Sequence, residues 1–156
     1  RESGHSVNKY QVTQILKEDE GFRDRTYLDT RGVPTIGYGR NLRDNPITQE
    51  ETAYLLGHIT EEDAIYLLER DIEDAEQACA RNITFWYTLP EHAQDVLVCL
   101  AFNMGITGLL EFRKTLKHLE EKEYRAAGDE LLISQWTHQV GYHRSQRMAD
   151  MLRNCQ

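Results

Sequence analysis

The feature that most constrains this chain is the change in hydrophobic periodicity that follows residue 20. Residues 9–20 repeat apolar side chains at helical spacing, and Gly21 follows as a residue that can end a helix by taking a positive φ. Residues 25–29 and 33–40 then read as two short strands, and residues 30–32 between them supply the glycine that a tight turn needs. The pattern therefore predicts one helix followed directly by one small hairpin.

From Thr48 onward the pattern is helical. Thr48 with Glu51 and Thr60 with Asp63 resemble capping boxes, in which side chain and backbone at a helix start bond reciprocally. The predicted helices cover residues 49–57, 61–80, 90–104, 112–122, 123–133 and 142–153.

This order of elements predicts a mainly helical α+β fold with a small antiparallel hairpin or sheet. We expect a single domain over residues 1–156, with a small β lobe at about 21–58. The helical lobe would cover about 61–156 and include the N-terminal helix. A cleft between the lobes is the expected site.

The charge balance excludes several functions. The formal net charge of −8 argues against nucleic-acid binding, which needs clustered Lys and Arg. No apolar run approaches the roughly 20 residues of a transmembrane helix, and no N-terminal stretch has the pattern of a signal peptide. The six His residues show no metal-ligand spacing, so we predict neither a metal site nor a cofactor.

The three cysteines show no metal-ligand spacing either. Cys99 lies in an apolar run, residues 96–102, and is predicted to be a buried small hydrophobe. A disulfide between Cys79 and Cys155 stays open at this point.

Two carboxylates in unlike surroundings flank the hairpin. Glu20 lies in the last turn of the predicted helix, where backbone carbonyl dipoles disfavour an anion and so favour the protonated acid. Asp29 lies at the entrance of the turn, where a carboxylate stays ionised, and the hydroxyl of Thr35 on the next strand is placed to hold a water against it. Glycoside hydrolysis needs such a pair, one group to donate a proton and one to activate water.

Gly37 and Gly39, unusual in a strand, indicate a bend or a close approach of the backbone to another group. Because the chain holds 26 Asp and Glu, the carboxylates alone would also fit a solvated surface pair.

The motifs around these residues resemble a known signature. The segments D-E-G at 19–21, Y-x-D-T at 27–30 and T-I-G-Y-G at 35–39 are similar to the catalytic region of phage T4-type lysozymes, glycoside hydrolase family 24. Residues 102–108 and 134–144 look like two further segments of that family, in the same order. The resemblance covers nearly the whole chain and implies a lysozyme-like two-lobe fold with a helical C-terminal lobe.

The resemblance also implies a reaction. It makes the chain a bacteriolytic muramidase that cleaves the β-1,4 bond between N-acetylmuramic acid and N-acetylglucosamine of bacterial peptidoglycan. Glu20 would be the general acid, and Asp29 with Thr35 would activate the attacking water. The family's inverting outcome places the two carboxyl groups about 6.5–9.5 Å apart.

The resemblance assigns substrate contacts as well. Phe102, Asn103, Gln139 and Arg144 would line the substrate site, whereas Trp136 is predicted to be core. Arg144 would also form an ion pair with Glu20 in the free enzyme, which would favour the ionised carboxylate.

The chain departs from the family in two sequence features, and its charge affects the encounter with the substrate. The segment between residues 39 and 60 looks shorter, and Arg40 replaces the family's His, with Asp71 at the place of its partner. An Arg40–Asp71 ion pair would keep the charge complementarity and lose the pH sensitivity of His. The net charge of −8 repels an anionic substrate at long range, which bears on the encounter rate.

Two alternatives remain. A lytic transglycosylase needs an acid Glu but no water-activating pair, so Asp29 and Thr35 argue against it. A catalytically inactive module that binds cell wall or serves as a virion part would be supported by the loss of one of these groups. We expect a monomer that acts on the cell wall, in the host periplasm or from a virion, without nucleic-acid or metal partners.

Overall fold

The computed structural model describes residues 7–52 and 59–156. The chain divides into two compact units, Thr13–Asp74 and Ala75–Gln156, the latter joined by the N-terminal residues to Val12. The boundaries fall inside α1 (Lys9–Glu20) and α3 (Glu61–Asn82), so both helices contribute to both units. The single domain and its two lobes remain a proposal.

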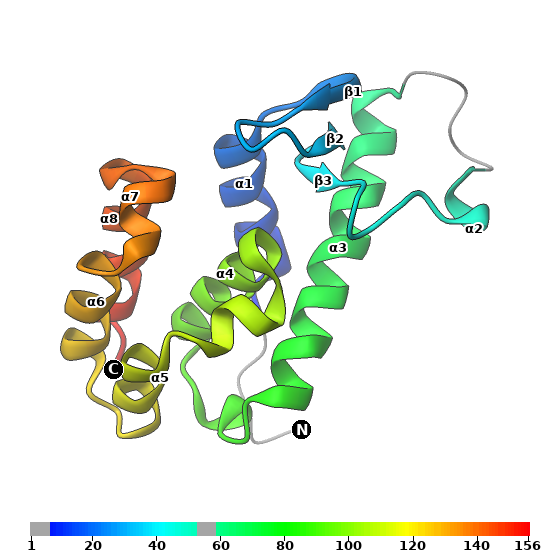
Figure 1. Ribbon diagram of the computed structural model, residues 1–156. Helices are drawn as coiled ribbons and strands as arrows, with labels where there is room; N and C mark the ends of the chain where they lie inside the picture. The colour runs from blue at the N-terminus through cyan, green and yellow to red at the C-terminus, as the bar shows by residue number, and fades with distance from the viewer. Residues whose placement is uncertain (1–6, 53–58) are drawn as a thin grey trace. The chain divides into compact units, whose positions relative to one another are not determined.

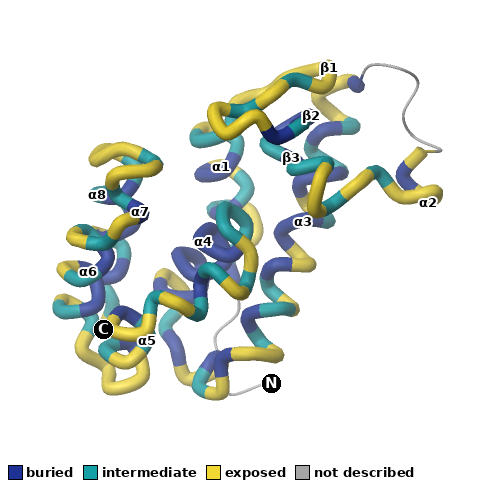
Figure 2. Tube along the Cα trace, viewed as in Figure 1, coloured by how far each residue is buried: buried dark blue, intermediate teal, exposed yellow. Residues whose placement is uncertain are grey.

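The unit Thr13–Asp74 contains the three-stranded antiparallel sheet of the described chain (Figure 1). Its strands are β1 (Arg23–Leu28), β2 (Pro34–Gly37) and β3 (Arg40–Asn41), in that order across the sheet. The turn between β1 and β2 contains Gly32 at φ +76°, as predicted. Figure 2 shows β1 exposed along nearly its whole length, whereas β2 is buried. The prediction of a mainly helical fold with one small sheet is confirmed.

The prediction of one continuous strand over residues 33–40 is wrong. The backbone turns between β2 and β3, because Gly37 and Gly39 take φ values of +66° and +77° that L side chains rarely adopt. The predicted bend at these glycines is therefore confirmed, and it yields a third strand.

The predicted helix starts are also confirmed. Thr48 and Glu51 bond reciprocally at 2.9 and 3.0 Å, and Thr60 and Asp63 do so at 3.0 and 3.1 Å. The first box opens α2 (Gln49–Thr52) and the second opens α3. The remainder of the helix predicted over 49–57 lies outside the described residues.

The unit Ala75–Gln156 is helical. Its further elements are η1 (Trp86–Thr88), α4 (Glu91–Leu110), α5 (Arg113–Glu120), α6 (Tyr124–Leu132), α7 (Gln135–Val140) and α8 (Tyr142–Arg153). Helix α6 packs against α5 and α8, and α8 also contacts α4 and α7 (Figure 1). The six-residue helix α7 was missed, since it is too short to show an apolar period.

Helix α4 supplies much of the core of this unit. Val96, Leu97, Val98 and Leu100 have no exposed surface. The helix continues beyond its predicted end at residue 104 to Leu110, although Gly105 interrupts its helical geometry with φ +77°. Among the described residues only α4 has the length and hydropathy of a membrane-crossing helix, a finding contrary to expectation. Of its apolar 18-residue stretch 56% is buried inside the protein, as in a core helix.

All three cysteines are free thiols. The disulfide left open between Cys79 and Cys155 is therefore not formed, and Cys79 and Cys99 are both buried. The prediction that Cys99 is a buried hydrophobe is confirmed.

Asp95 is a fully buried carboxyl group in α4. Its Oδ1 accepts a hydrogen bond of 2.9 Å from the backbone N–H of Asn8, and no described residue bonds its Oδ2. Burial raises the pKa of Asp95 to about 7, and the negative charges of Glu91 and Glu76 act in the same direction. The fold therefore holds this group more easily as the neutral acid than as the anion.

Asp95→Asn is expected to stabilise the protein at about pH 8 and to have much less effect at about pH 5. The folded pKa of about 7 lies above the ordinary value of 3.8, so the native state binds the proton more tightly than the unfolded chain. The stability contributed by this proton is complete below the ordinary pKa and is lost as the pH rises through the folded pKa. Replacing the buried anion should raise the free energy of unfolding by up to about 4 kcal/mol at the higher pH. Thermal melts at both pH values measure this, with exposed Asp74→Asn as control; a pH-independent difference would contradict it.

Candidate active site

Glu20, Asp29 and Thr35 all belong to the unit Thr13–Asp74. Glu20 is the last residue of α1, which ends where the N–H of Gly21 bonds the carbonyl of Lys17 at 3.0 Å. The half-buried Glu20 side chain lies against the turn between β2 and β3. A Cβ atom added at Gly39 would meet Glu20 Oε1 at 2.7 Å and Cγ at 2.8 Å. The predicted close approach at Gly39 is confirmed, and the approaching group is the Glu20 carboxyl.

Asp29 is held as an anion at the hairpin turn. Its Oδ1 accepts backbone hydrogen bonds from Arg31 at 2.8 Å and from Val33 at 2.9 Å. The bond from Val33 is the main cause that lowers the pKa of Asp29, and the Arg31 bond and the charges of Arg31 and Arg43 add to it. The expectation that this carboxylate stays ionised is confirmed. Its Oδ2 accepts no hydrogen bond from the part of the chain that the structure describes.

Thr35 is anchored to the same residue as Asp29. Thr35 is only 4% exposed, and its Oγ1 donates a hydrogen bond of 2.8 Å to the carbonyl of Val33. That carbonyl also accepts the backbone N–H of Asp29 at 3.0 Å. Val33 therefore holds both side chains, and the Thr35 hydroxyl, having given its hydrogen to Val33, can accept a bond from another group.

Tyr27 lies beside Asp29 and Thr35 on the hairpin, and the sequence assigned it no role in the site. It pairs with Thr35 across the sheet and, two residues before Asp29, belongs to the same face of the hairpin. Burial raises the pKa of Tyr27, as do the nearby negative charges of Glu20 and Asp29. The guanidinium of Arg23 lies 4.5 Å from the centre of its ring. The alternation of side chains along a strand, which places residues 27 and 29 on one face, could have identified Tyr27 from the sequence.

The other predicted substrate contacts belong to the unit Ala75–Gln156. The Oδ1 of Asn103 accepts bonds from Arg144 Nη1 at 3.3 Å and, at a long 3.5 Å, from Trp136 Nε1. Trp136 is buried, as predicted, and lines a pocket of about 650 Å³ together with exposed Gln139. Phe102 is half-buried in α4 and does not line this pocket. The predicted ion pair between Glu20 and Arg144 joins residues of the two units and stays a prediction.

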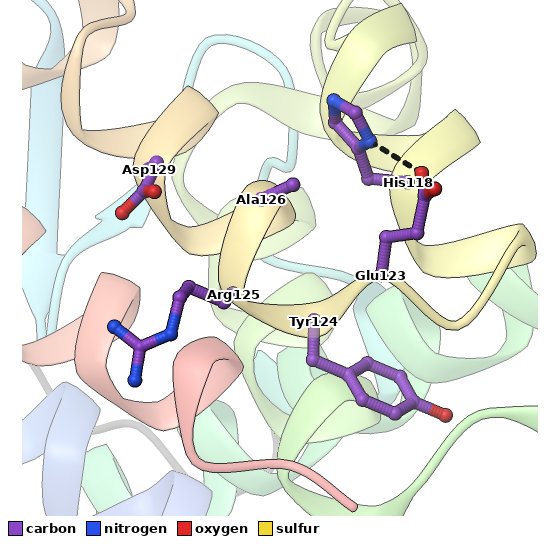
Figure 3. Close-up of a pocket in the computed structure, with 6 residues that line it drawn as sticks. All are labelled: His118, Glu123, Tyr124, Arg125, Ala126 and Asp129. Carbon is purple, nitrogen blue, oxygen red and sulfur yellow. Dashed lines mark hydrogen bonds and ion pairs between the residues drawn. The ribbon is translucent and has the colours of Figure 1, made fainter.

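A second pocket, of about 460 Å³, lies on the surface of the same unit (Figure 3). Its side chains include His118, which bonds Glu123 Oε1 through Nδ1 at 2.9 Å, and Asp129. It contains none of the residues predicted for catalysis or binding. Among residues 7–52 and 59–156, no group of three His, Cys, Asp or Glu side chains is placed to hold a metal ion.

A buried charge network supports the sheet next to Glu20. The predicted Arg40–Asp71 pair is confirmed, with Arg40 Nε at 3.0 and 3.1 Å from the two carboxylate oxygens. Glu51 completes it with two bonds of 2.9 and 2.7 Å from Arg40 and one of 2.8 Å from Arg70. Glu51 was predicted only as part of a capping box, since a sequence does not show which acidic residue is buried. The network fixes β3, and with it the turn that contacts Glu20, to α2 and α3.

Gly39→Ala is expected to displace the Glu20 carboxyl and to reduce turnover at least about tenfold, with a modest loss of stability of about 1–2 kcal/mol from the left-handed backbone. The added Cβ should move the Glu20 carboxyl rather than the turn, because the end of a side chain shifts at a lower cost than backbone does. Activity and thermal melts should be compared with those of Gly32→Ala. Gly32 has a similar φ of +76° but no atom within 4 Å of the added Cβ. Equal activity losses in the two variants would show that strain alone, and not the contact with Glu20, is responsible.

The fold and the site together define a class of protein. A mainly helical α+β chain presents a helix-end glutamate and an ionised aspartate at a small sheet, and two unlike carboxyl groups are what glycoside hydrolases use. The family described as Phage lysozyme matches residues 17–153. The chain belongs to the phage lysozyme family, and thereby to the peptidoglycan hydrolases of lysozyme type, which act on the bacterial cell wall.

Individual relatives agree with this assignment. The chain is 29% identical over 160 residues to probable T4-type lysozyme 1 of Dictyostelium discoideum, covering 90% of this chain and 92% of that protein. It is 32% identical over 120 residues to the endolysin of Salmonella phage P22, covering 76% of each. It is also 30% identical to the pre-baseplate central spike protein Gp5 of Enterobacteria phage T4, over 80% of this chain and 25% of that protein.

Proposed function

We propose that this protein is an inverting muramidase that cleaves the β-1,4 bond between N-acetylmuramic acid and N-acetylglucosamine. The observation that carries the proposal is the common anchoring of Asp29 and Thr35 on Val33. It places an ionised carboxylate and an accepting hydroxyl oxygen on one hairpin, in the unit that also holds Glu20 at the end of α1.

The hydrogen-bond directions support a specific role for this pair. The Thr35 hydroxyl gives its hydrogen to Val33, and Asp29 has Oδ2 available, so both groups act as acceptors. A water between two acceptors points both hydrogens at the protein and directs a lone pair away from it. In the reaction, that oxygen bonds to the anomeric carbon while the glycosidic C–O bond breaks. The leaving oxygen takes the proton of Glu20, and Asp29 takes the proton of the water.

The second unit is proposed to bind the substrate. Asn103, oriented by Arg144 and Trp136, and Gln139 at the rim of the 650 Å³ pocket offer amides for sugar N-acetyl or peptide groups. Phe102 adds apolar surface. Arg144 is proposed to pair with Glu20 before substrate binds, so binding would have to restore the acid form. We propose a monomer that needs neither cofactor nor metal.

The test is the configuration of the first product. The protein is incubated with purified peptidoglycan, and the newly formed reducing ends are followed by NMR before mutarotation. An initial α-anomer supports the proposal, and an initial β-anomer contradicts inversion. Products with 1,6-anhydromuramic ends would identify a lytic transglycosylase. The absence of new ends would favour an inactive cell-wall-binding or virion module.

A further inference from the structure

The negative charge of this protein is distributed unevenly. The whole chain carries a formal charge of −8. Residues 21–45, which contain the sheet, hold five arginines and three aspartates and therefore carry +2, so the remainder carries −10. The segment that presents Asp29 is therefore positive within an acidic protein. Residues 134–156, with three arginines and one aspartate, also carry +2.

Four of the five arginines of this segment are exposed, and Arg31 and Arg43 are the two whose charges act on Asp29. Both side chains are exposed, and neither forms an ion pair with any residue in 7–52 or 59–156. Arg40, by contrast, is buried between Glu51 and Asp71. Arg31 belongs to the same turn as Asp29, and its backbone N–H bonds Asp29 Oδ1 at 2.8 Å. Arg43 follows Leu42, whose N–H bonds the carbonyl of Pro34 at 2.8 Å, next to the Val33 that anchors Asp29. The positive charges of both arginines act on Asp29.

Arg31 and Arg43 are not needed to keep Asp29 ionised. The backbone bond from Val33 is the larger cause of the lowered Asp29 pKa, and Asp29 lies in a half-exposed turn where little is needed to keep it charged. Two unpaired guanidinium groups beside an exposed site are suited to bind a carboxylate of the ligand, because the guanidinium fork matches carboxylate geometry.

We propose that Arg31 and Arg43 form a carboxylate-binding rim, which binds a carboxylate of the peptidoglycan strand beside Asp29. The inference rests on the proposed function, since it names which part of that substrate the site recognises. The carboxylate belongs either to the stem peptides or to the lactyl group of muramic acid. The rim also offsets, locally, the repulsion between the acidic protein and its substrate.

The test compares two double variants of equal charge. Arg31→Gln/Arg43→Gln removes the rim, and Arg81→Gln/Arg125→Gln removes two other exposed arginines of the unit Ala75–Gln156. The rim variant should raise KM for peptidoglycan about three- to tenfold with a small change in kcat, as expected for two screened contacts made before the transition state. Its KM should depend less on salt than that of the wild type. The acid limb of its pH–rate profile should move to higher pH, since Asp29 loses two nearby positive charges.

The source of the carboxylate follows from binding measurements in a Glu20→Gln background, which are independent of turnover. In a peptide-bearing strand the lactyl carboxyl is bound as an amide, and amidase frees it. A rim effect on intact peptidoglycan that disappears on amidase-treated glycan assigns the stem peptide, and one that appears only on the amidase-treated glycan assigns the lactyl group. Neither double variant should change binding of uncharged chito-oligosaccharides. Equal dissociation constants for the rim and control variants on peptidoglycan overturn the inference. A wild-type protein that binds without releasing reducing ends would contradict the proposed function instead.

Discussion

Glu20→Gln should reduce turnover on purified peptidoglycan about 10²–10⁴-fold while the thermal melt stays close to that of the wild type. Glutamine keeps the shape of the side chain that lies against Gly39, but it cannot donate a proton as an acid. Folding should survive, since Glu20 is only half-buried at the end of α1. Reducing-end release and a thermal melt on the same preparation measure both effects.

Glu18→Gln is the matched control for this change. It makes the same replacement of a carboxylate by an amide, at an exposed glutamate in the same helical turn. This variant should keep nearly full activity. If Glu20→Gln melts normally and retains more than about a tenth of wild-type turnover, Glu20 is not the general acid.

Arg40→Leu should lower the free energy of unfolding by about 3–5 kcal/mol. Arg40, Glu51 and Asp71 are only 3%, 1% and 7% exposed, so the substitution leaves two buried carboxylates without their shared cation. Breaking a buried ion pair by removing one partner is costly because the remaining charge stays desolvated. Denaturant unfolding at about neutral pH measures the loss.

Arg153→Leu provides the control for this second prediction. Arg153 also bonds two carboxylates, Asp129 at 2.7 Å and Asp150 at 3.1 Å, but at an exposed site. Its loss should cost less than about 1 kcal/mol. Similar losses for the two variants would contradict a special role of the buried network, whereas partial recovery in an Arg40→Leu/Glu51→Leu/Asp71→Leu triple variant would support it.

The network should also limit stability in acid. The hydrogen bonds from Arg40 are the main cause that lowers the pKa of Glu51 to about 2, from an ordinary 4.5. The stability contributed by this depressed carboxyl is present above the ordinary value and is lost as the pH falls through the folded value. Burial raises the pKa of Asp71, the second carboxyl of the network. Because Arg40 stays charged at every accessible pH, the cation itself has no transition near neutral pH of the kind that a histidine would give.

Local chemistry made several parts of this structure predictable from sequence. The end of α1 at Glu20 follows from Gly21, the starts of α2 and α3 follow from two capping boxes, and the hairpin turn follows from Gly32. These features depend on residues within about four positions of each other, so the sequence carries the whole of their cause. The order of the family motifs also depends on sequence alone, and it led to the phage lysozyme family.

Contacts between distant segments were decided only in the tertiary structure. Gly39 approaches the Glu20 carboxyl, and Glu51 reaches Arg40, because strands and helices far apart along the chain pack together. Which of 26 acidic residues is buried, and which arginine is left unpaired, depends on that packing and leaves no periodic signal in the sequence. Sequence therefore determined most of the elements, though not α7 or β3, and the candidate residues Glu20, Asp29 and Thr35. Burial and hydrogen bonding, which arise only on folding, determined the surroundings and charge states of these residues.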